Sequence, residues 1–258
     1  MRRPLAAFAL LALAAPLAAP LAAKQAAPSP AITAAVAAPD RPATQTALDE
    51  GRKPAAVLAF LGLKPGMVAA DIMAGAGYYT EIMASAVGPN GMVSAFEPEQ
   101  FMNDPRGQKP WAELKKRRAN VALIPYPFDM FSAAPASLDF ALLHLVYHDL
   151  YWESAQFKVP RTDPAAFLAE LFKAMKPGGI VGVVDHVALP GETRATADKL
   201  HRIDPETVKA DFKAAGFVLE GESDLLRMPS DDHAKLVFDP AVRGKTDRFV
   251  FRFRKPKQ

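Results

Sequence analysis

The chain contains 258 residues, of which 50% are hydrophobic and 23% are charged, a balance typical of one globular domain with a full hydrophobic core. Cysteine is absent, which excludes disulfides, thiolate metal sites, iron–sulfur clusters and cysteine nucleophiles. The 31 basic and 28 acidic residues give a formal net charge of +3, an excess too small to indicate nucleic acid binding.

Residues 1–23 have the pattern of a secretory signal peptide. Arg2 and Arg3 supply the positive start, an uncharged apolar run follows, and residues 21–23 form a small-residue cleavage site. Two prolines interrupt the apolar run before it reaches the roughly 20 residues of a membrane-spanning helix. We therefore predict a periplasmic or secreted protein, with no stable membrane anchor after the signal is cleaved.

Residues 24–40 are rich in alanine and proline and carry hardly any charge. This composition predicts a disordered leader, because it offers little apolar surface to bury. We expect the folded domain to occupy residues 41–258.

Within that domain, segments with helical character alternate with apolar segments of strand length. The predicted strands are 67–73, 92–96, 121–124, 138–145, 180–185, 217–223 and 248–253. The predicted helices are 53–61, 79–87, 111–119, 165–175 and 204–215. This alternation indicates an α/β fold, in which a doubly wound seven-stranded sheet carries helices on both faces.

A pair of glycines follows directly on the first predicted strand. Gly75 and Gly77 lie between that strand and the next helix, where such a loop brings the backbone close to a ligand at the carboxyl edge of the sheet. Glu97 ends the second strand, where a carboxylate can bind both hydroxyls of a ribose. The sequence therefore predicts a cofactor that contains a nucleoside.

Two cofactor classes fit such a loop. A dinucleotide requires a third glycine for close helix packing, and Thr80 occupies that position. Asp71 would repel a pyrophosphate but would attract a cationic ammonium or sulfonium group. We therefore favour S-adenosylmethionine over NAD, which leaves a dinucleotide oxidoreductase as the less favoured hypothesis.

These segments also carry a resemblance to a known family. Residues 71–80, Glu97 and residues 138–149 resemble the class I S-adenosylmethionine-dependent methyltransferases. The chain is more narrowly similar to a group of exported predicted methyltransferases at residues 52–54, 77–80, 147–151, 200–204 and 231–233. Over residues 41–256, the resemblance implies a Rossmann-like methyltransferase domain that acts on a small-molecule acceptor.

The resemblance also implies which residues bind the cofactor. They are Asp71, Ala74, Gly75, Gly77, Tyr78, Glu97, Asp129 and Tyr147. Asp71 and the two glycines would line the methionine end, Glu97 the ribose, and Asp129 the adenine amino group. The chain departs from the family at Met73, where glycine is usual. Tyr147 is open to a second interpretation as an ordinary packed aromatic residue.

Histidines next to acids follow the fourth and fifth predicted strands. His148 with Asp149 and, less strongly, His186 are the candidate catalytic residues, because methyl transfer aligns an acceptor and, where needed, removes its proton. His148 could instead cap a helix, and His186 could order its loop together with Asp185.

The remaining histidines leave several interpretations open. His201 and Arg202 could begin a helix with a salt bridge or contact an anionic acceptor, and residues 231–233 could form a turn or a lid. Histidine–carboxylate clusters also bind metals, but no close-spaced ligand pair such as H-x-x-x-H occurs. We therefore assign no metal ligands.

An alternative function is a non-catalytic module that binds a nucleoside or metabolite on the same fold. S-adenosylmethionine is made in the cytosol, so the signal peptide and the expected cofactor are in tension. The sequence identifies neither the methyl acceptor nor the oligomeric state.

Overall fold

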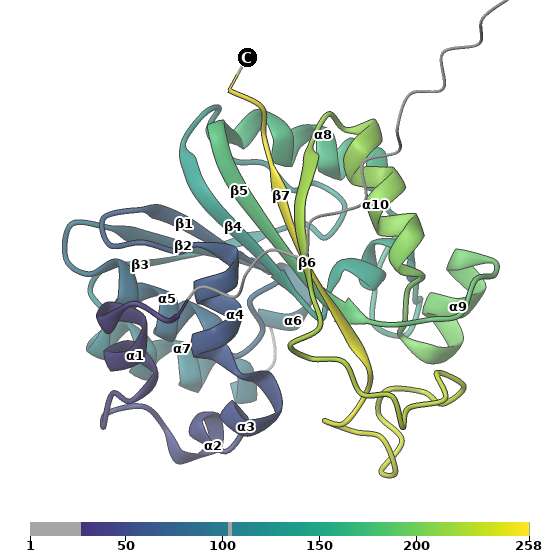
Figure 1. The fold of residues 1–258 in the computed structure, drawn as a ribbon, viewed down its shortest axis with the longest axis horizontal. Helices are drawn as coiled ribbons and strands as arrows, with labels where there is room; N and C mark the ends of the chain where they lie inside the picture. Colours follow the sequence, from purple (N-terminus) through teal and green to yellow (C-terminus); the bar gives the residue numbers. More distant parts are fainter. Residues whose placement is uncertain (1–26, 103–104, 258) are drawn as a thin grey trace, which may run out of the picture.

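A computed structural model describes residues 27–102 and 105–257 of the protein. Seven strands form one sheet in the order β3-β2-β1-β4-β5-β7-β6 (Figure 1). The strands are β1 (Val68–Ile72), β2 (Met92–Pro98), β3 (Val121–Tyr126), β4 (Leu138–His144), β5 (Met175–His186), β6 (Val218–Ser223) and β7 (Arg248–Arg254). β7 runs antiparallel to β5 and β6, and the other neighbouring pairs are parallel. The predicted doubly wound seven-stranded sheet is thereby confirmed.

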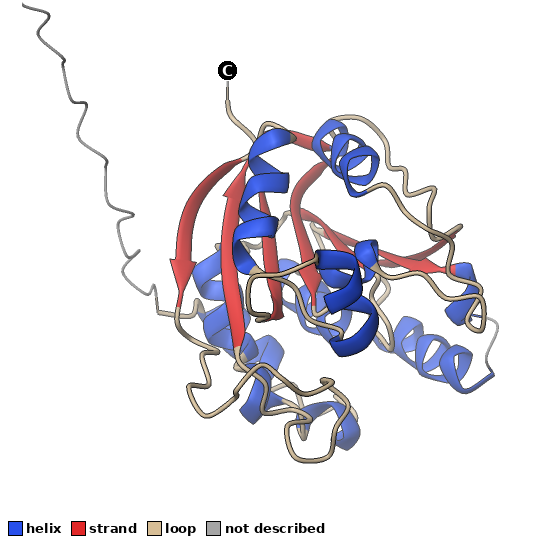
Figure 2. Cartoon of the chain, turned by 90° about the vertical axis from the view of Figure 1, so that its right-hand side faces the viewer, coloured by secondary structure: helices blue, strands red, loops and turns tan. Residues whose placement is uncertain are grey.

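Helices cover both faces of the sheet (Figure 2). They are α1 (Pro30–Val36), α2 (Ala43–Thr46), α3 (Asp49–Arg52), α4 (Pro54–Leu61), α5 (Tyr78–Val87), α6 (Glu99–Met102), α7 (Pro105–Arg117), α8 (Pro164–Ala174), α9 (Thr193–Leu200) and α10 (Pro205–Ala214), with a 3-10 helix η1 (Tyr147–Tyr151). The sequence predicted the longer helices next to the strands, but it missed α1, α2, α3, α6, α9 and η1. Most of the missed helices are short and have too few apolar positions to show a helical period.

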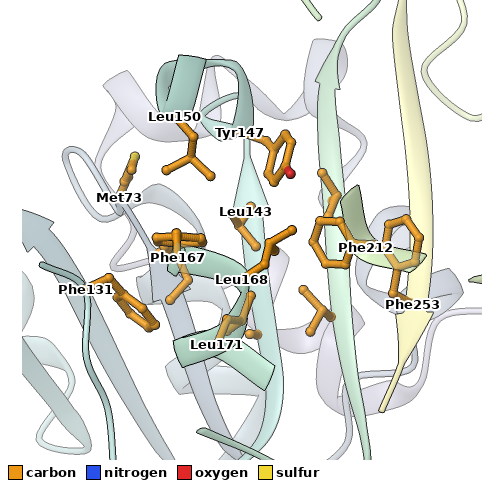
Figure 3. Close-up of a cluster of buried hydrophobic side chains, with 14 of the residues drawn as sticks. Met73, Phe131, Leu143, Tyr147, Leu150, Phe167, Leu168, Leu171, Phe212 and Phe253 are labelled. Atoms are coloured by element: carbon orange, nitrogen blue, oxygen red, sulfur yellow. The ribbon is translucent and has the colours of Figure 1, made fainter. Parts of the chain in front are cut away.

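Two hydrophobic clusters lie on opposite faces of the sheet. One contains buried side chains of α1, α4 and α5, and the other those of η1, α8 and α10. Residues 249, 251 and 253 of β7 pack in the second cluster, whereas Val250 packs in the first, as the alternation of a strand requires. Figure 3 shows the second cluster, with Met73 at its edge near Leu150.

The leader prediction needs a correction, because residues 30–36 form helix α1. Pro30 occupies its first turn, and the Ser29 side chain accepts a hydrogen bond from the Ile32 amide, two features that favour helix initiation. Ile32 and Ala35 are buried against α4 and α5. These few apolar residues dock on a neighbouring surface, which the composition of the segment alone does not show. The predicted signal peptide, residues 1–23, lies outside the described residues.

No helix within residues 27–102 and 105–257 is both long and apolar enough to cross a membrane. A long connection, residues 224–247, joins β6 to β7 and crosses the lower right of Figure 1. The fully buried guanidinium of Arg202 fastens it, donating to both carboxylate oxygens of Asp231 at 2.7 and 3.1 Å.

The order in which the chain adds strands to the sheet determines where a ligand site can form. From β1 the chain winds outward to β2 and β3, and then returns to β4 on the other side of β1. The loops that follow β1 and β4 therefore diverge and leave a crevice at the carboxyl ends of these strands, where ligands bind in folds of this kind.

Candidate active site

Two cavities lie in the crevice at the carboxyl ends of β1, β2 and β4. The first, the Asp71 cavity, has a volume of about 400 Å³ and is lined by Arg52, Asp71 and His144 among others. The second, the Glu97 cavity, has about 350 Å³ and is lined by Glu97 and Asp149 among others. Both cavities share the side chains or backbone of residues 73, 75, 76 and 146. The glycine loop thus contributes to both cavities, with one carboxylate in each.

The loop after β1 has an unusual backbone. Met73, Gly75 and Gly77 all have positive φ, at 53°, 58° and 77°. A Cβ atom on Gly77 would lie 2.6 Å from Leu114 Cδ1, so this position requires glycine both for its conformation and for space. Met73 takes the left-handed conformation without being glycine, which accounts for the family's usual glycine there. Its side chain packs in the core, only 8% exposed.

Asp71 is buried at the end of β1, as the sequence predicted for a residue that faces the ligand. Its carboxylate accepts a hydrogen bond of 2.6 Å from the Thr80 hydroxyl. Burial raises the pKa of Asp71 to about 7, although the Thr80 hydrogen bonds and the charge of Arg52 act to lower it. Among the described residues no cation forms an ion pair with Asp71.

Three further polar groups of the Asp71 cavity were missed by the sequence analysis. The Arg52 guanidinium stacks 4.3 Å from the centre of the Tyr78 ring and makes no ion pair in the described part of the chain. Gln45 Oε1 and His144 Nε2 are buried and have no hydrogen-bond partner there. Arg52 and Gln45 lie on or beside short helices that the sequence did not predict, and His144 reads as an ordinary strand residue.

Glu97 lies at the end of β2 and lines its cavity as predicted. One of its carboxylate oxygens accepts a hydrogen bond of 2.7 Å from the Gly75 amide. Burial raises the pKa of Glu97 to about 8, and the neighbouring charge of Asp71 adds to the effect, while the Gly75 hydrogen bond opposes it. A pKa raised in this way favours the protonated form of Glu97 at neutral pH.

The other predicted cofactor residues divide into two groups. Ala74 and Tyr78 line the Asp71 cavity, and the Tyr78 hydroxyl donates to Asp49 at 2.6 Å. Asp129 is exposed and lines neither cavity, because the turn after β3 directs Phe128 inward instead. Tyr147 is fully buried in the core beside Phe212 and lines neither cavity, so the structure supports its interpretation as a packed aromatic.

His148 and Asp149 lie on η1, directly after β4. The buried Asp185 carboxylate accepts hydrogen bonds from the His148 amide at 2.9 Å and from its Nδ1 at 2.8 Å. Nε2 of His148 lies 3.3 Å from Asp149 Oδ1. Burial disfavours a charged imidazole, yet the Asp149 and Asp185 carboxylates outweigh it and raise the pKa of His148 to about 9. Of these residues, Asp149 lines the Glu97 cavity and His148 does not.

His186, the other catalytic candidate, lies at the end of β5 and lines neither cavity. Its Nδ1 is 2.7 Å from the Thr246 hydroxyl, and its amide donates to Asp185. Burial lowers the pKa of His186 well below its ordinary value. These contacts favour the alternative that the sequence left open, in which His186 orders its loop together with Asp185.

Comparison with protein families gives one match. The model of the protein-L-isoaspartate(D-aspartate) O-methyltransferase family matches residues 45–104. This range contains α3, β1, the glycine loop, α5 and β2, and therefore both buried carboxylates of the crevice. It ends before β4 and η1. No curated protein matches the chain.

Solved structures share the fold over most of the chain. A SAM-dependent methyltransferase from Aquifex aeolicus is 20% identical with a TM-score of 0.57, and the alignment covers 85% of this chain and 96% of that one. A putative sarcosine dimethylglycine methyltransferase from Galdieria sulphuraria is 16% identical with a TM-score of 0.58, covering 83% and 87%. A methyltransferase from Mesorhizobium loti is 15% identical with a TM-score of 0.55, covering 80% and 99%.

Proposed function

We propose that this chain, which has the fold of class I S-adenosylmethionine-dependent methyltransferases, is an enzyme of that class and methylates a small molecule in the periplasm or outside the cell. The observation that carries the proposal is the pair of buried carboxylates, Asp71 and Glu97, on two cavities that share the glycine loop. A carboxylate at each place suits a ligand with an ammonium group at one end and a ribose further along.

The groups in the Asp71 cavity fit the methionine part of such a ligand. That part is a zwitterion, and the cavity offers Asp71 to its ammonium group and Arg52 to its carboxylate. Gln45 Oε1 adds a buried acceptor that has no partner among the described residues, and an ammonium group would satisfy it. A buried charge or polar atom without a partner is costly, so these groups favour a ligand that completes them.

S-adenosylmethionine, when bound, supplies an electrophilic methyl group on its sulfonium. The chain's own residues would hold the donor and place an acceptor beside it. On the acceptor side, Asp149 lines the Glu97 cavity. The hydrogen bonds between His148 and the buried Asp185 fix the position of η1. We therefore assign Asp149 to contact with the acceptor and His148 to positioning, since Asp149 lines the cavity and His148 does not.

Calorimetric titration of the mature protein tests donor binding and the zwitterion assignment together. S-adenosylmethionine and S-adenosylhomocysteine should bind, and 5′-methylthioadenosine, which lacks the amino-acid part, should bind about 100-fold more weakly. Arg52→Gln should weaken both amino-acid ligands about 10-fold and leave methylthioadenosine unchanged. Lys53→Gln, on the neighbouring residue that lines neither cavity, is the matched control.

No heat with any of the three ligands at millimolar concentration would overturn the proposal, and binding of NADH instead would favour an oxidoreductase. Donor binding without methyl transfer to any acceptor in a periplasmic extract would favour the non-catalytic module. Export is tested separately, by mass spectrometry of the amino terminus. Cleavage near Lys24 is expected, and an intact Met1 on active protein would contradict it.

A further inference from the structure

Three side chains from two separate segments converge beside the Glu97 cavity. His148 and Asp149 lie on η1, and His201 follows the last residue of α9. One ligand atom from each lies within 4.8 Å of the others. The Asp149 Oδ1 atom is 3.3 Å from His148 Nε2 and 3.6 Å from His201 Nδ1. A tetrahedral zinc site, with bonds of about 2.0–2.1 Å, separates its ligand atoms by about 3.3–3.4 Å.

The ring of His148 is already oriented for such a role. Asp185, which is fully buried, binds Nδ1 of His148 and also accepts from the amides of residues 148 and 186. This leaves Nε2 directed toward Asp149. A histidine that ligates a metal characteristically donates its other ring nitrogen to a carboxylate, which fixes the tautomer and the orientation of the ring.

The backbone and the neighbouring rings also fix the orientation of the His201 side chain. Its backbone is left-handed, with φ 49° and ψ 50°, which ends α9 and turns the side chain toward η1. Its ring lies at 85° to the His148 ring and is flanked by Trp152 and Phe238 at 5.1 and 5.2 Å. Two imidazoles at a right angle, each with a nitrogen near the same carboxylate oxygen, leave room for one ion between the three side chains.

The surroundings of the Asp149 carboxylate also favour a bound cation. In the described part of the chain, its ion-pair partners are the two imidazoles alone. A divalent ion bound between the two rings would supply positive charge beside this carboxylate.

We propose that His148, Asp149 and His201 bind one divalent transition-metal ion, for which Zn²⁺ is the best fit, at the edge of the Glu97 cavity. Two imidazoles and one carboxylate are the ligand set of catalytic zinc sites that keep an open position. Because Asp149 lines the cavity, an ion held by these three residues would lie beside the space assigned to the acceptor. The ion would bind an oxygen or sulfur atom of that acceptor, a consequence that rests on the proposed function, whereas the metal site itself does not.

The test uses tag-free, chelator-treated mature protein and no methyl donor. Zn²⁺ should bind one equivalent with a dissociation constant below micromolar, and Mg²⁺ at millimolar concentration should not compete. Co²⁺ should give the intense visible absorption of a low-symmetry site, which cannot come from thiolate because the chain has no cysteine. His201→Gln should weaken Zn²⁺ at least 100-fold and abolish the cobalt spectrum.

His233→Gln is the matched control, because His233 pairs with Asp247 outside this cluster. Its zinc affinity and cobalt spectrum should equal those of the original protein. Thermal unfolding of both variants checks that each is folded. Absence of Zn²⁺ binding, or equal binding by His201→Gln, would overturn the proposal. S-adenosylmethionine binding by the chelated protein would then remain, so failure of the metal site and failure of the methyltransferase assignment are distinguishable.

Discussion

Buried carboxylates occur in two regions of the molecule, and their surroundings differ. Asp71 and Glu97 face the crevice without an ion-pair partner in the described residues, and burial raises the pKa of both. Asp231 and Asp247 lie in the connection between β6 and β7. Burial opposes their charged forms too, but Arg202 for Asp231, and Arg227 with His233 for Asp247, hold their pKa values below the ordinary range.

The difference separates a structural role from a ligand-binding role. A buried carboxylate whose cation comes from the same chain has its charge compensated within the fold, and removal of one partner is strongly destabilising because the other charge is left unpaired. A carboxylate left without a cation destabilises the empty protein, and a ligand that brings positive charge can reverse this. Substitution of Arg202, the cation that pairs with Asp231, should therefore lower the stability of the fold. Substitution of Asp71 or Glu97, which have no such cation, should mainly weaken ligand binding.

The largest effect on stability is expected for Arg202→Ala. It leaves Asp231 buried without its cation and should lower the free energy of unfolding by about 3–5 kcal/mol. Denaturant unfolding measures the loss. Lys209→Ala, which removes more exposed ion pairs with Glu206 and Glu222, should cost less than about 1 kcal/mol. Equal losses in the two variants would remove the distinction between the regions.

Asp71→Asn should change binding and stability in opposite directions. S-adenosylmethionine affinity should fall about 100-fold, since the ammonium group loses its counterion. The empty variant should be more stable than the original protein at pH 8 by about 1–3 kcal/mol. In the original protein the unfolded Asp71 releases its proton near pH 4 and the folded one near pH 7, so its contribution to stability falls as pH rises across that interval.

Thermal unfolding at pH 5 and pH 8, with and without donor, measures both effects. The gain in stability of the Asp71→Asn variant over the original protein should be larger at pH 8 than at pH 5. Asp139→Asn is the control, because this half-buried aspartate pairs with Lys176 near the opposite ends of the strands. A variant that is destabilised at pH 8, or one that binds the donor normally, would contradict the assignment of Asp71.

The fold and half of the site could be predicted because their signals are local in the sequence. The alternation of apolar segments defined the seven strands, and Asp71, Gly75 and Glu97 fall at strand ends that parallel pairing brings together. Arg52, Gln45 and His201 could not be found in this way. They reach the crevice from short or exposed helices, and their positions depend on packing between segments far apart in the chain.

The same reason explains two placements that differed from the prediction. Tyr147 and His186 follow strands at the functional edge, but the direction of each side chain was decided by tertiary partners, Asp211 for Tyr147 and Thr246 for His186. The position of each residue along its strand predicted the edge of the sheet near which it lies. It did not predict the direction of the side chain.

If Asp71 and Glu97 hold the donor together, its binding should release protons. Near pH 7, Asp71 and Glu97 are partly or largely protonated in the empty site, and a bound ammonium group and ribose hydroxyls favour their charged forms. Calorimetry of S-adenosylmethionine binding in buffers of different ionisation enthalpy should show release of about one proton. The release should be smaller in the Glu97→Gln variant and also smaller in the Asp71→Asn variant. Binding with no proton exchange, or with the same release in both variants, would contradict the account.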